Sequence, residues 1–438
     1  MHRGSLMKWG AGVLILAALA ALYLVPYAIL VRQPAPRVTE IYFADRMTDA
    51  HRIIIEKYNA LHAGRVRVVP VDFPNLEFST NERKEILARS LRGEGDDIDL
   101  LAVDLIWTKR FARWCEPLGK YFSREELARI IPDALIGCYD EGELVAVPLD
   151  RVLGVLFYRE DLLRKCRGGE EAIRGLQSQM TWPAFLGLKE RLSWKGPFYV
   201  FPASDYEGFI CIYVEILLGL RRDYFSAYGF NFDTPQGREA LRLLVDLVQK
   251  HGATPAIVTS FTEAPSYEYF IRNDGLFLRG WTTYAKDFKD HPYDARKEGE
   301  LRIAPIPHLP GGRPASLFGG WNLMIPQSCK NKQAVVDFVK FLLTSESQEI
   351  LYTEGGYFPV VTSFYNDPAS TAKYPEVEAI RELMRTGVHR PTDRSYTNNS
   401  KIMSHYFVLA IKKKISVEEA VAGATAAIGS DRTMVVAR

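Results

Sequence analysis

Strand-like and helix-like segments alternate between residues 38 and 105. The short runs "VTEIYFA", "RVRVVPVDF" and "IDLLAVDL" are rich in branched and aromatic residues, which favour β-strands. The two segments between them carry apolar residues at helical spacing; the first ends at Gly64, and the second begins with Thr80 or Asn81 as its cap. Because this order is typical of a parallel sheet with helical crossovers, the sequence predicts an α/β fold.

A second unit follows this alternation. The runs "TWPAFLGLKERL" and "TPQGREALRLLVDLVQKHG" are predicted helices that begin at the N-caps Thr181 and Thr234, and "YEGFICIYVEILLGL" is apolar enough to be a buried helix. Three prolines in "RIAPIPHLPGG" indicate an extended segment that crosses between domains. With 438 residues, the chain is long enough for two domains of roughly 150 residues or more.

The N-terminus carries an uncharged run from Trp9 to Val31, preceded by Arg3 and Lys8. The basic flank predicts that the rest of the chain is exported, to the periplasm or the cell exterior. The run is close to the length of a membrane span, which favours an anchor in the inner membrane, and a cleaved signal is the alternative.

Composition excludes several functions. A net charge of +2 gives no reason to expect a nucleic-acid partner. We find no GxSxG, HExxH, GxxxxGK[ST] or GxGxxG motif, and therefore predict neither an enzyme nor a cofactor. The cysteines have no metal-ligand spacing, so no metal site is expected. In an oxidising compartment, Cys115 and Cys138 would close the shortest disulfide loop.

Six segments share one resemblance: "DDIDLLAVDLIWTKRFARWCEPLGKYF", "GELVAVPLDRVLGVLFYREDLL", "TWPAFL", "YEGF", "LFLRGW" and "SLFGGWNLMIPQSCKNKQAVVDFVKFLLTSESQ". They resemble the extracellular solute-binding proteins of ABC importers, a family that includes maltose- and trehalose-type sugar receptors. The resemblance runs from about Thr39 to Pro359, and the last segment is the most specific. It implies a type II periplasmic-binding-protein fold, in which two α/β lobes joined by crossing strands close on a ligand about a hinge. The expected ranges are 1–37 for the anchor and linker, 38–148 plus 306–358 for lobe one, and 149–305 plus 359–438 for lobe two.

Carried over to this chain, the resemblance implies that a solute binds between the lobes. Aromatic faces would cover the carbons of a sugar ring, and polar side chains would bind its hydroxyls. The expected ligand-binding residues are Arg46, Asp104, Trp107, Asp150, Arg151, Tyr206, Glu207, Trp281 and Trp321. Each has a structural alternative, such as packing for the tryptophans or capping for Asp104 and Glu207.

Two further features concern the space beside Trp321 and the charge of the solute. Gly319 and Gly320 are interpreted as leaving space beside Trp321 for the solute. Arg46, Arg151 and Arg279 would suit an anionic solute, unless they pair with nearby acids such as Asp45 and Asp150.

The sequence therefore predicts a monomeric protein that captures a saccharide and delivers it to an ABC permease. A membrane-anchored ligand sensor with the same cleft is an alternative. A glycoside hydrolase, which needs two carboxylates across the sugar, is a weaker one.

Overall fold

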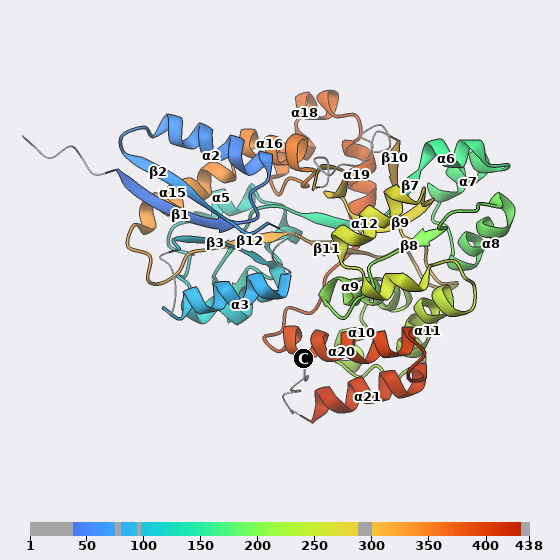
Figure 1. Ribbon diagram of the computed structural model, residues 1–438. Helices are drawn as coiled ribbons and strands as arrows, with labels where there is room; N and C mark the ends of the chain where they lie inside the picture. Colours follow the sequence, from blue (N-terminus) through green and yellow to red (C-terminus); the bar gives the residue numbers. More distant parts are fainter. Residues whose placement is uncertain (1–37, 75–79, 94–97, 288–299, 431–438) are drawn as a thin grey trace, which may run out of the picture.

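The computed structural model describes residues 38–74, 80–93, 98–287 and 300–430, which form two lobes side by side (Figure 1). Lobe one is built on a five-stranded sheet of order β2-β1-β3-β12-β6. Its strands are β1 (Thr39–Asp45), β2 (Val66–Asp72), β3 (Leu100–Asp104), β6 (Val147–Pro148) and β12 (Trp321–Met324). Strand β1 runs parallel to both β2 and β3, so the predicted parallel α/β arrangement is confirmed.

Lobe two is built on a second sheet of order β13-β11-β7-β9-β8, in which β10 also pairs with β7. Its strands are β7 (Val152–Arg159), β8 (Tyr199–Val200), β9 (Phe277–Trp281), β10 (Leu301–Ala304), β11 (Ser316–Gly319) and β13 (Gly387–Val388). A small hairpin, β4 (Tyr139–Asp140) with β5 (Glu143–Leu144), stands apart from both sheets. Every residue of β7 is buried, as expected for a strand with neighbours on both sides and covered faces.

Helices cover the two sheets, and Figure 1 shows α2 and α3 on opposite faces of the first sheet. Before β7 they are α2 (Asp49–Leu61), α3 (Thr80–Leu91), η1 (Leu105–Trp107), α4 (Thr108–Phe111), η2 (Ala112–Trp114), α5 (Arg124–Ala128) and η3 (Pro132–Leu135). Between β7 and β11 they are α6 (Glu160–Lys165), α7 (Gly169–Leu176), α8 (Trp182–Leu192), α9 (Glu207–Leu220), α10 (Tyr224–Tyr228), α11 (Pro235–Gln249), η4 (Ala256–Ser260), α12 (Glu263–Arg272) and α13 (Tyr284–Asp287). After β12 they are α15 (Lys332–Leu342), α16 (Ser345–Gly355), α17 (Thr362–Asn366), α18 (Pro368–Lys373), α19 (Val377–Met384), α20 (Tyr396–Ile411) and α21 (Val417–Gly429).

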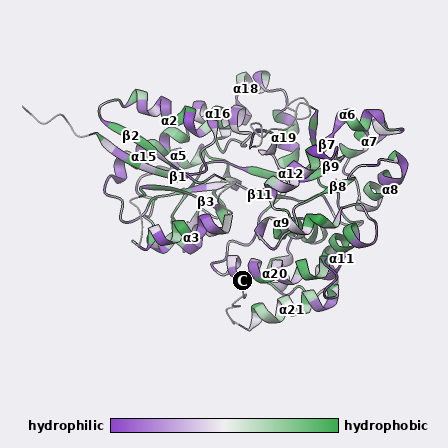
Figure 2. Ribbon diagram, viewed as in Figure 1, coloured by the Kyte–Doolittle hydropathy of each residue, from purple (hydrophilic) through white to green (hydrophobic). Residues whose placement is uncertain are grey.

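Local sequence signals explain the helices that matter here. The side chains of Thr181 and Thr234 accept hydrogen bonds from the first turns of α8 and α11, as predicted. Helix α9 is almost entirely buried. Outer helices such as α3 and α8 carry both polar and apolar residues, as amphipathic helices do (Figure 2). Each lobe has its own apolar core.

The chain passes from lobe two back to lobe one within a single residue. Strand β11 pairs with β7 in the second sheet, β12 pairs with β3 in the first, and Gly320 joins them. The range 306–358 expected for lobe one thus contains a strand of the second sheet. The lobe boundaries stay a prediction, and the strand pairing favours a change of lobe at Gly320 rather than at residue 306.

The expected Cys115–Cys138 disulfide is wrong, because both side chains are free buried thiols. Cys115 pairs through its backbone with Pro326, whereas the Cys138 thiol donates to the Ala134 carbonyl oxygen at 3.6 Å, so their surroundings differ. Within the described part of the chain, no helix is both long and apolar enough to cross a membrane. The expected anchor, residues 9–31, lies outside the described residues.

Candidate functional site

Trp321 opens β12 at the point where the chain enters lobe one. Its indole is partly exposed, and one face is covered by the guanidinium of Arg83, 4.1 Å from the ring centroid. Beneath it lies Trp107, edge-on at 6.0 Å between ring centroids. Trp107 is only 2% exposed, so core residues cover the ring faces that a sugar would need. The structure therefore favours the packing alternative for Trp107, whereas the indole of Trp321 stays partly exposed.

Trp281 is the counterpart from lobe two. It ends β9, is partly exposed, and carries the guanidinium of Arg279 at 4.1 Å from its ring centroid. It lies close to Gly319, because a β-carbon added there would be 3.1 Å from Cζ3 of the indole. Trp281 and Trp321 thus flank the same crossover, one from each lobe.

The two glycines do not leave an empty space. A β-carbon at Gly320 would lie 2.5 Å from the Asp150 carbonyl oxygen and 3.0 Å from Cα of Arg151. Gly320 also has a φ of +127°, which residues with a side chain rarely adopt. The interpretation of these glycines as a gap for the solute is therefore wrong: Gly320 packs against the backbone of the segment before β7, and Gly319 packs against the side chains of Val152 and Trp281.

Asp150 is the most unusual polar residue near the crossover. It is fully buried, and neither carboxylate oxygen has a hydrogen-bond partner among the described residues. Burial raises the pKa of this carboxyl well above its usual range, and the negative charge of Asp45 raises it further. An unpaired buried carboxyl beside two partly exposed tryptophans is the kind of polar group that a ligand hydroxyl satisfies.

Arg151 follows Asp150 but turns away from it. Its side chain is buried and donates to the Ala134 carbonyl oxygen at 2.5 Å, while its backbone pairs with Phe358. The structure thus assigns Arg151 a contact that holds the crossing segments together.

Arg46 connects the two lobes. Placed just after β1, it forms an ion pair with Asp287 of α13 and donates to the Tyr357 hydroxyl at 2.8 Å. The neighbouring Asp45 is buried, where it accepts from Arg83 at 3.0 Å. Through its ion pair with Asp287, Arg46 therefore links lobe one to lobe two beside the crossover.

A second interlobe link joins three residues. Arg390 donates to Asp104 at the end of β3, at 3.0 Å, and to Glu207 at the start of α9, at 2.8 Å. Burial raises the pKa of the Glu207 carboxyl, and Arg390 opposes that shift. Tyr396 and Ser400 of α20 also donate to Glu207. Asp104 and Glu207 therefore meet through Arg390, a residue that the sequence analysis missed because it lies outside the segments that carry the family resemblance.

Tyr206 and Arg279 have mainly structural surroundings. Tyr206 immediately precedes α9 and folds over Gly208, where an added β-carbon would meet its hydroxyl at 2.3 Å. Arg279 is fully buried and forms a bidentate pair with Glu215 of α9, at 2.6 and 3.1 Å. The alternative in which nearby acids neutralise the arginines is thus confirmed for Arg279, although its partner is Glu215.

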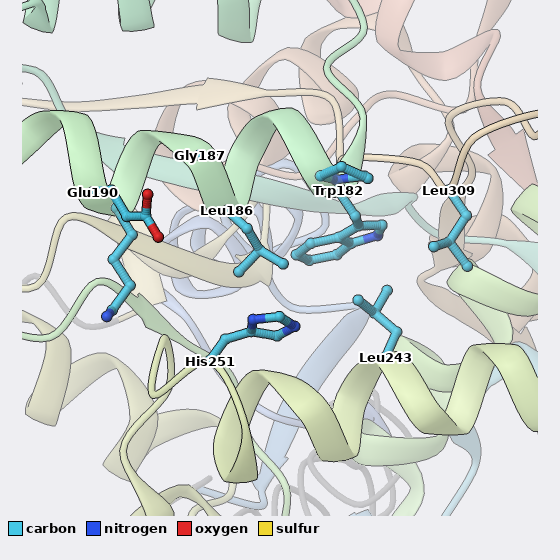
Figure 3. Close-up of a pocket in the computed structure, with 9 residues that line it drawn as sticks. Trp182, Leu186, Gly187, Glu190, Leu243, His251 and Leu309 are labelled. Atoms are coloured by element: carbon cyan, nitrogen blue, oxygen red, sulfur yellow. The ribbon is translucent and has the colours of Figure 1, made fainter.

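A separate cavity of about 460 Å³ lies within lobe two. Figure 3 shows Trp182 and Leu186 of α8 facing Leu243 of α11, with His251 and Leu309 at its sides. None of the expected site residues lines it. In the described residues, no group of three or more His, Cys, Asp or Glu side chains could hold a metal ion.

Sequence comparison decides the family. The model of the bacterial extracellular solute-binding protein family matches residues 44–349. The chain belongs to this family. A probable ABC transporter-binding protein of Deinococcus radiodurans is 25% identical to this solute-binding protein over 350 residues, which cover 76% of the present chain and 80% of the relative.

Solved structures agree on the fold of this solute-binding protein. The maltose-bound MalE3 of T. maritima superposes with a TM-score of 0.78 at 24% identity, over 90% of the present chain and 100% of that chain. The maltotriose-binding protein of Thermus thermophilus, bound with maltotriose, gives 0.68 at 19% identity, over 89% and 99%. These likenesses confirm the predicted two-lobed α/β fold. Membership of an extracellular, non-catalytic family places the protein in the periplasm or at the cell exterior.

Proposed function

We propose that this protein captures a saccharide between its two lobes and delivers it to an ABC permease. The observation that carries the proposal is the pair Trp281 and Trp321, one from each lobe, both partly exposed at the crossover. The relatives named above support the same assignment, since two of them hold maltose or maltotriose and one is described as an ABC transporter-binding protein.

The chemistry of the crossover suits a sugar. Indole faces cover the apolar carbons of a pyranose ring, and closure of the lobes removes both from water. The carboxyl of Asp150 has no hydrogen-bond partner among the described residues, but it is fully buried, so a sugar hydroxyl reaches it only if opening of the lobes exposes it. Because Trp281 and Trp321 come from different lobes, a solute that contacts both must touch both lobes. Binding of such a solute favours the closed form.

Ion pairs support the closed arrangement. Arg46–Asp287 and Asp104–Arg390–Glu207 both cross between the lobes. Because the carboxylates of Asp104 and Glu207 already bind one guanidinium, they are poorly placed to serve as the acid and base of a glycosidase. We therefore propose a binding role without catalysis.

The remaining features of the proposal concern assembly. We propose that the protein acts as a monomer and that residues 9–31 tether it to the inner membrane. N-terminal analysis of the mature protein tests the tether: a mature chain that begins after residue 31 would show that the segment is a cleaved signal. A sensor role, the alternative with the same cleft, is distinguished by whether the purified protein stimulates its permease.

The proposal is tested by titrating the protein with maltose, maltotriose and trehalose while tryptophan fluorescence is recorded. We expect Trp321→Ala to weaken binding by about 1–3 kcal/mol, the value of burying a large apolar side chain. Trp194→Ala is the matched control, because Trp194 donates to the Asp274 carbonyl oxygen in lobe two, away from the crossover. If no saccharide changes the fluorescence or the thermal stability of the wild-type protein, the proposed function is wrong.

A further inference from the structure

Four cations line a cavity of about 200 Å³ between the lobes. Lys109, Arg110 and Arg113 come from α4 and η2 of lobe one, and Arg394 comes from the segment before α20. Among the described residues, no acidic side chain lines this cavity. A cavity lined only by like charges is costly unless an anion or solvent compensates them.

The four cations differ in how far the protein itself satisfies them. Arg110 donates to the Thr397 hydroxyl at 3.0 Å, and Arg394 donates to Asp140 at 2.6 Å and to Glu141 at 3.1 Å.

Lys109 and Arg113 stand apart from this pattern. Lys109 has no hydrogen bond or ion pair to any residue that the structure describes, and Arg113 only stacks on Trp114, at 4.0 Å. Two positively charged groups therefore remain available to a ligand.

Further positive charge surrounds the cavity. Lys84 of α3 is largely shielded from water, and burial lowers its pKa. Glu85 opposes this shift, whereas the charges of Arg110 and Lys401 add to it. Lys84 is itself paired with Glu85 at 3.4 Å, and Arg394 with Asp140 and Glu141, so the uncompensated positive charge at the cavity comes from Lys109 and Arg113.

The cavity adjoins the proposed sugar site. Asp104 caps η1, and η1 continues directly into α4. The Thr108 hydroxyl of α4 accepts from Asn322, the neighbour of Trp321 in β12. On the other lobe, Arg394 lies four residues beyond Arg390, the residue that binds both Asp104 and Glu207. The cations thus come from chain segments that directly follow Asp104 and Arg390.

We infer that the solute is an acidic saccharide, whose carboxylate, sulfate or phosphate group binds Lys109 and Arg113. This inference rests on the proposed function and specifies its substrate class. It does not use the guanidiniums expected from the sequence: Arg46 and Arg279 are paired with acids, and Arg151 is buried against a carbonyl oxygen.

The test compares neutral and acidic sugars of one skeleton by isothermal titration calorimetry on the purified protein. The ligands are glucose, glucuronate, glucose 6-sulfate and glucose 6-phosphate, with sodium phosphate and sodium sulfate as free anions at constant ionic strength. We expect at least one acidic sugar to bind about 10-fold or more tighter than glucose, the gain from one charge-assisted hydrogen bond. The three acidic sugars distinguish carboxylate, sulfate and phosphate as the group recognised.

The variant Lys109→Gln/Arg113→Gln should reduce the affinity for the acidic sugar to that for glucose. The control variant Arg124→Gln/Lys330→Gln removes the same charge from exposed positions of lobe one and should keep the preference. The inference is overturned if the wild type binds neutral sugars as tightly as acidic ones, or if the double variant keeps the preference. It is also overturned if free phosphate or sulfate binds while no acidic sugar exceeds glucose. Binding of maltotriose without an acid preference would leave the proposed function intact.

Discussion

Replacement of Gly320 by alanine should destabilise the protein more than any other glycine substitution in the crossover. The new methyl would lie 2.5 Å from the Asp150 carbonyl oxygen and 3.0 Å from Cα of Arg151. Both atoms belong to the backbone, which cannot rotate away as a side chain can. The φ of +127° adds a second cost, because a residue with a β-carbon is strained there.

The two costs can be added. Strain at a φ that suits glycine alone is worth about 1–3 kcal/mol. Forcing a methyl group into a well-packed region costs about 1–3 kcal/mol more. We therefore expect Gly320→Ala to lower the free energy of unfolding by about 2–6 kcal/mol, a large fraction of the about 5–15 kcal/mol typical of a folded domain.

Two matched variants separate the contributions. Gly311 has a φ of +78° and nothing within 4 Å of an added β-carbon, so Gly311→Ala reports the cost of φ alone, about 1–2 kcal/mol. An added β-carbon at Gly319 would meet the side chains of Val152 at 2.7 Å and Trp281 at 3.1 Å. Gly319→Ala should therefore displace Trp281 and weaken saccharide binding more than it weakens the fold.

Urea unfolding followed by circular dichroism gives the free energies, and fluorescence titration with maltotriose gives the affinities. The reasoning is refuted if Gly320→Ala is as stable as Gly311→Ala and only its affinity falls. That result would mean that the β-carbon of residue 320 points into space reserved for the solute.

Three further predictions follow from buried polar groups. Since burial raises the pKa of Asp150, the folded state holds this proton after the unfolded chain has released it near pH 4, so wild-type stability falls as the pH rises from there. Asp150→Asn cannot ionise, so its stability relative to wild type should increase between pH 4 and pH 8 in urea unfolding; a constant difference contradicts this. Glu215→Gln breaks the buried pair with Arg279 and should cost about 3–5 kcal/mol, whereas Glu215→Leu with Arg279→Met should recover most of the loss; equal stability of the two variants would contradict it. Dithiothreitol should leave the melting temperature unchanged, because Cys115 and Cys138 are free thiols. Ellman's reagent should label both only after unfolding, because burial raises the pKa of both thiols. Prompt labelling of the native protein would count against this.

The sequence predicts the fold of lobe one well because its signals are local. The strands that become β1, β2 and β3 are apolar runs separated by amphipathic segments, and their parallel pairing follows from that order. Strand β11 was harder to place. Only Gly320 separates Ser316–Gly319 from Trp321–Met324, and pairing of β11 with β7 and of β12 with β3 divides the two between the sheets.

The site was predicted less completely, since burial and partners depend on tertiary contacts. A tryptophan at the end of a strand can be buried, as Trp107 is, or stay partly exposed, as Trp321 does, and the sequence does not distinguish the two. Glu215 offered a usable signal, because an acid within the buried interior of the apolar helix α9 needs a cationic partner. Arg390 offered none: its two partners lie 183 and 286 residues away.

The position of β12 also affects how the protein reaches its compartment. This strand lies between β3 and β6 in the first sheet, yet it follows them in the chain by more than 170 residues. The sheet of lobe one therefore stays incomplete until residue 324 has left the ribosome, and pairing over such a separation is slow. If the chain is exported during its synthesis, it therefore enters the membrane before the sheet of lobe one is complete.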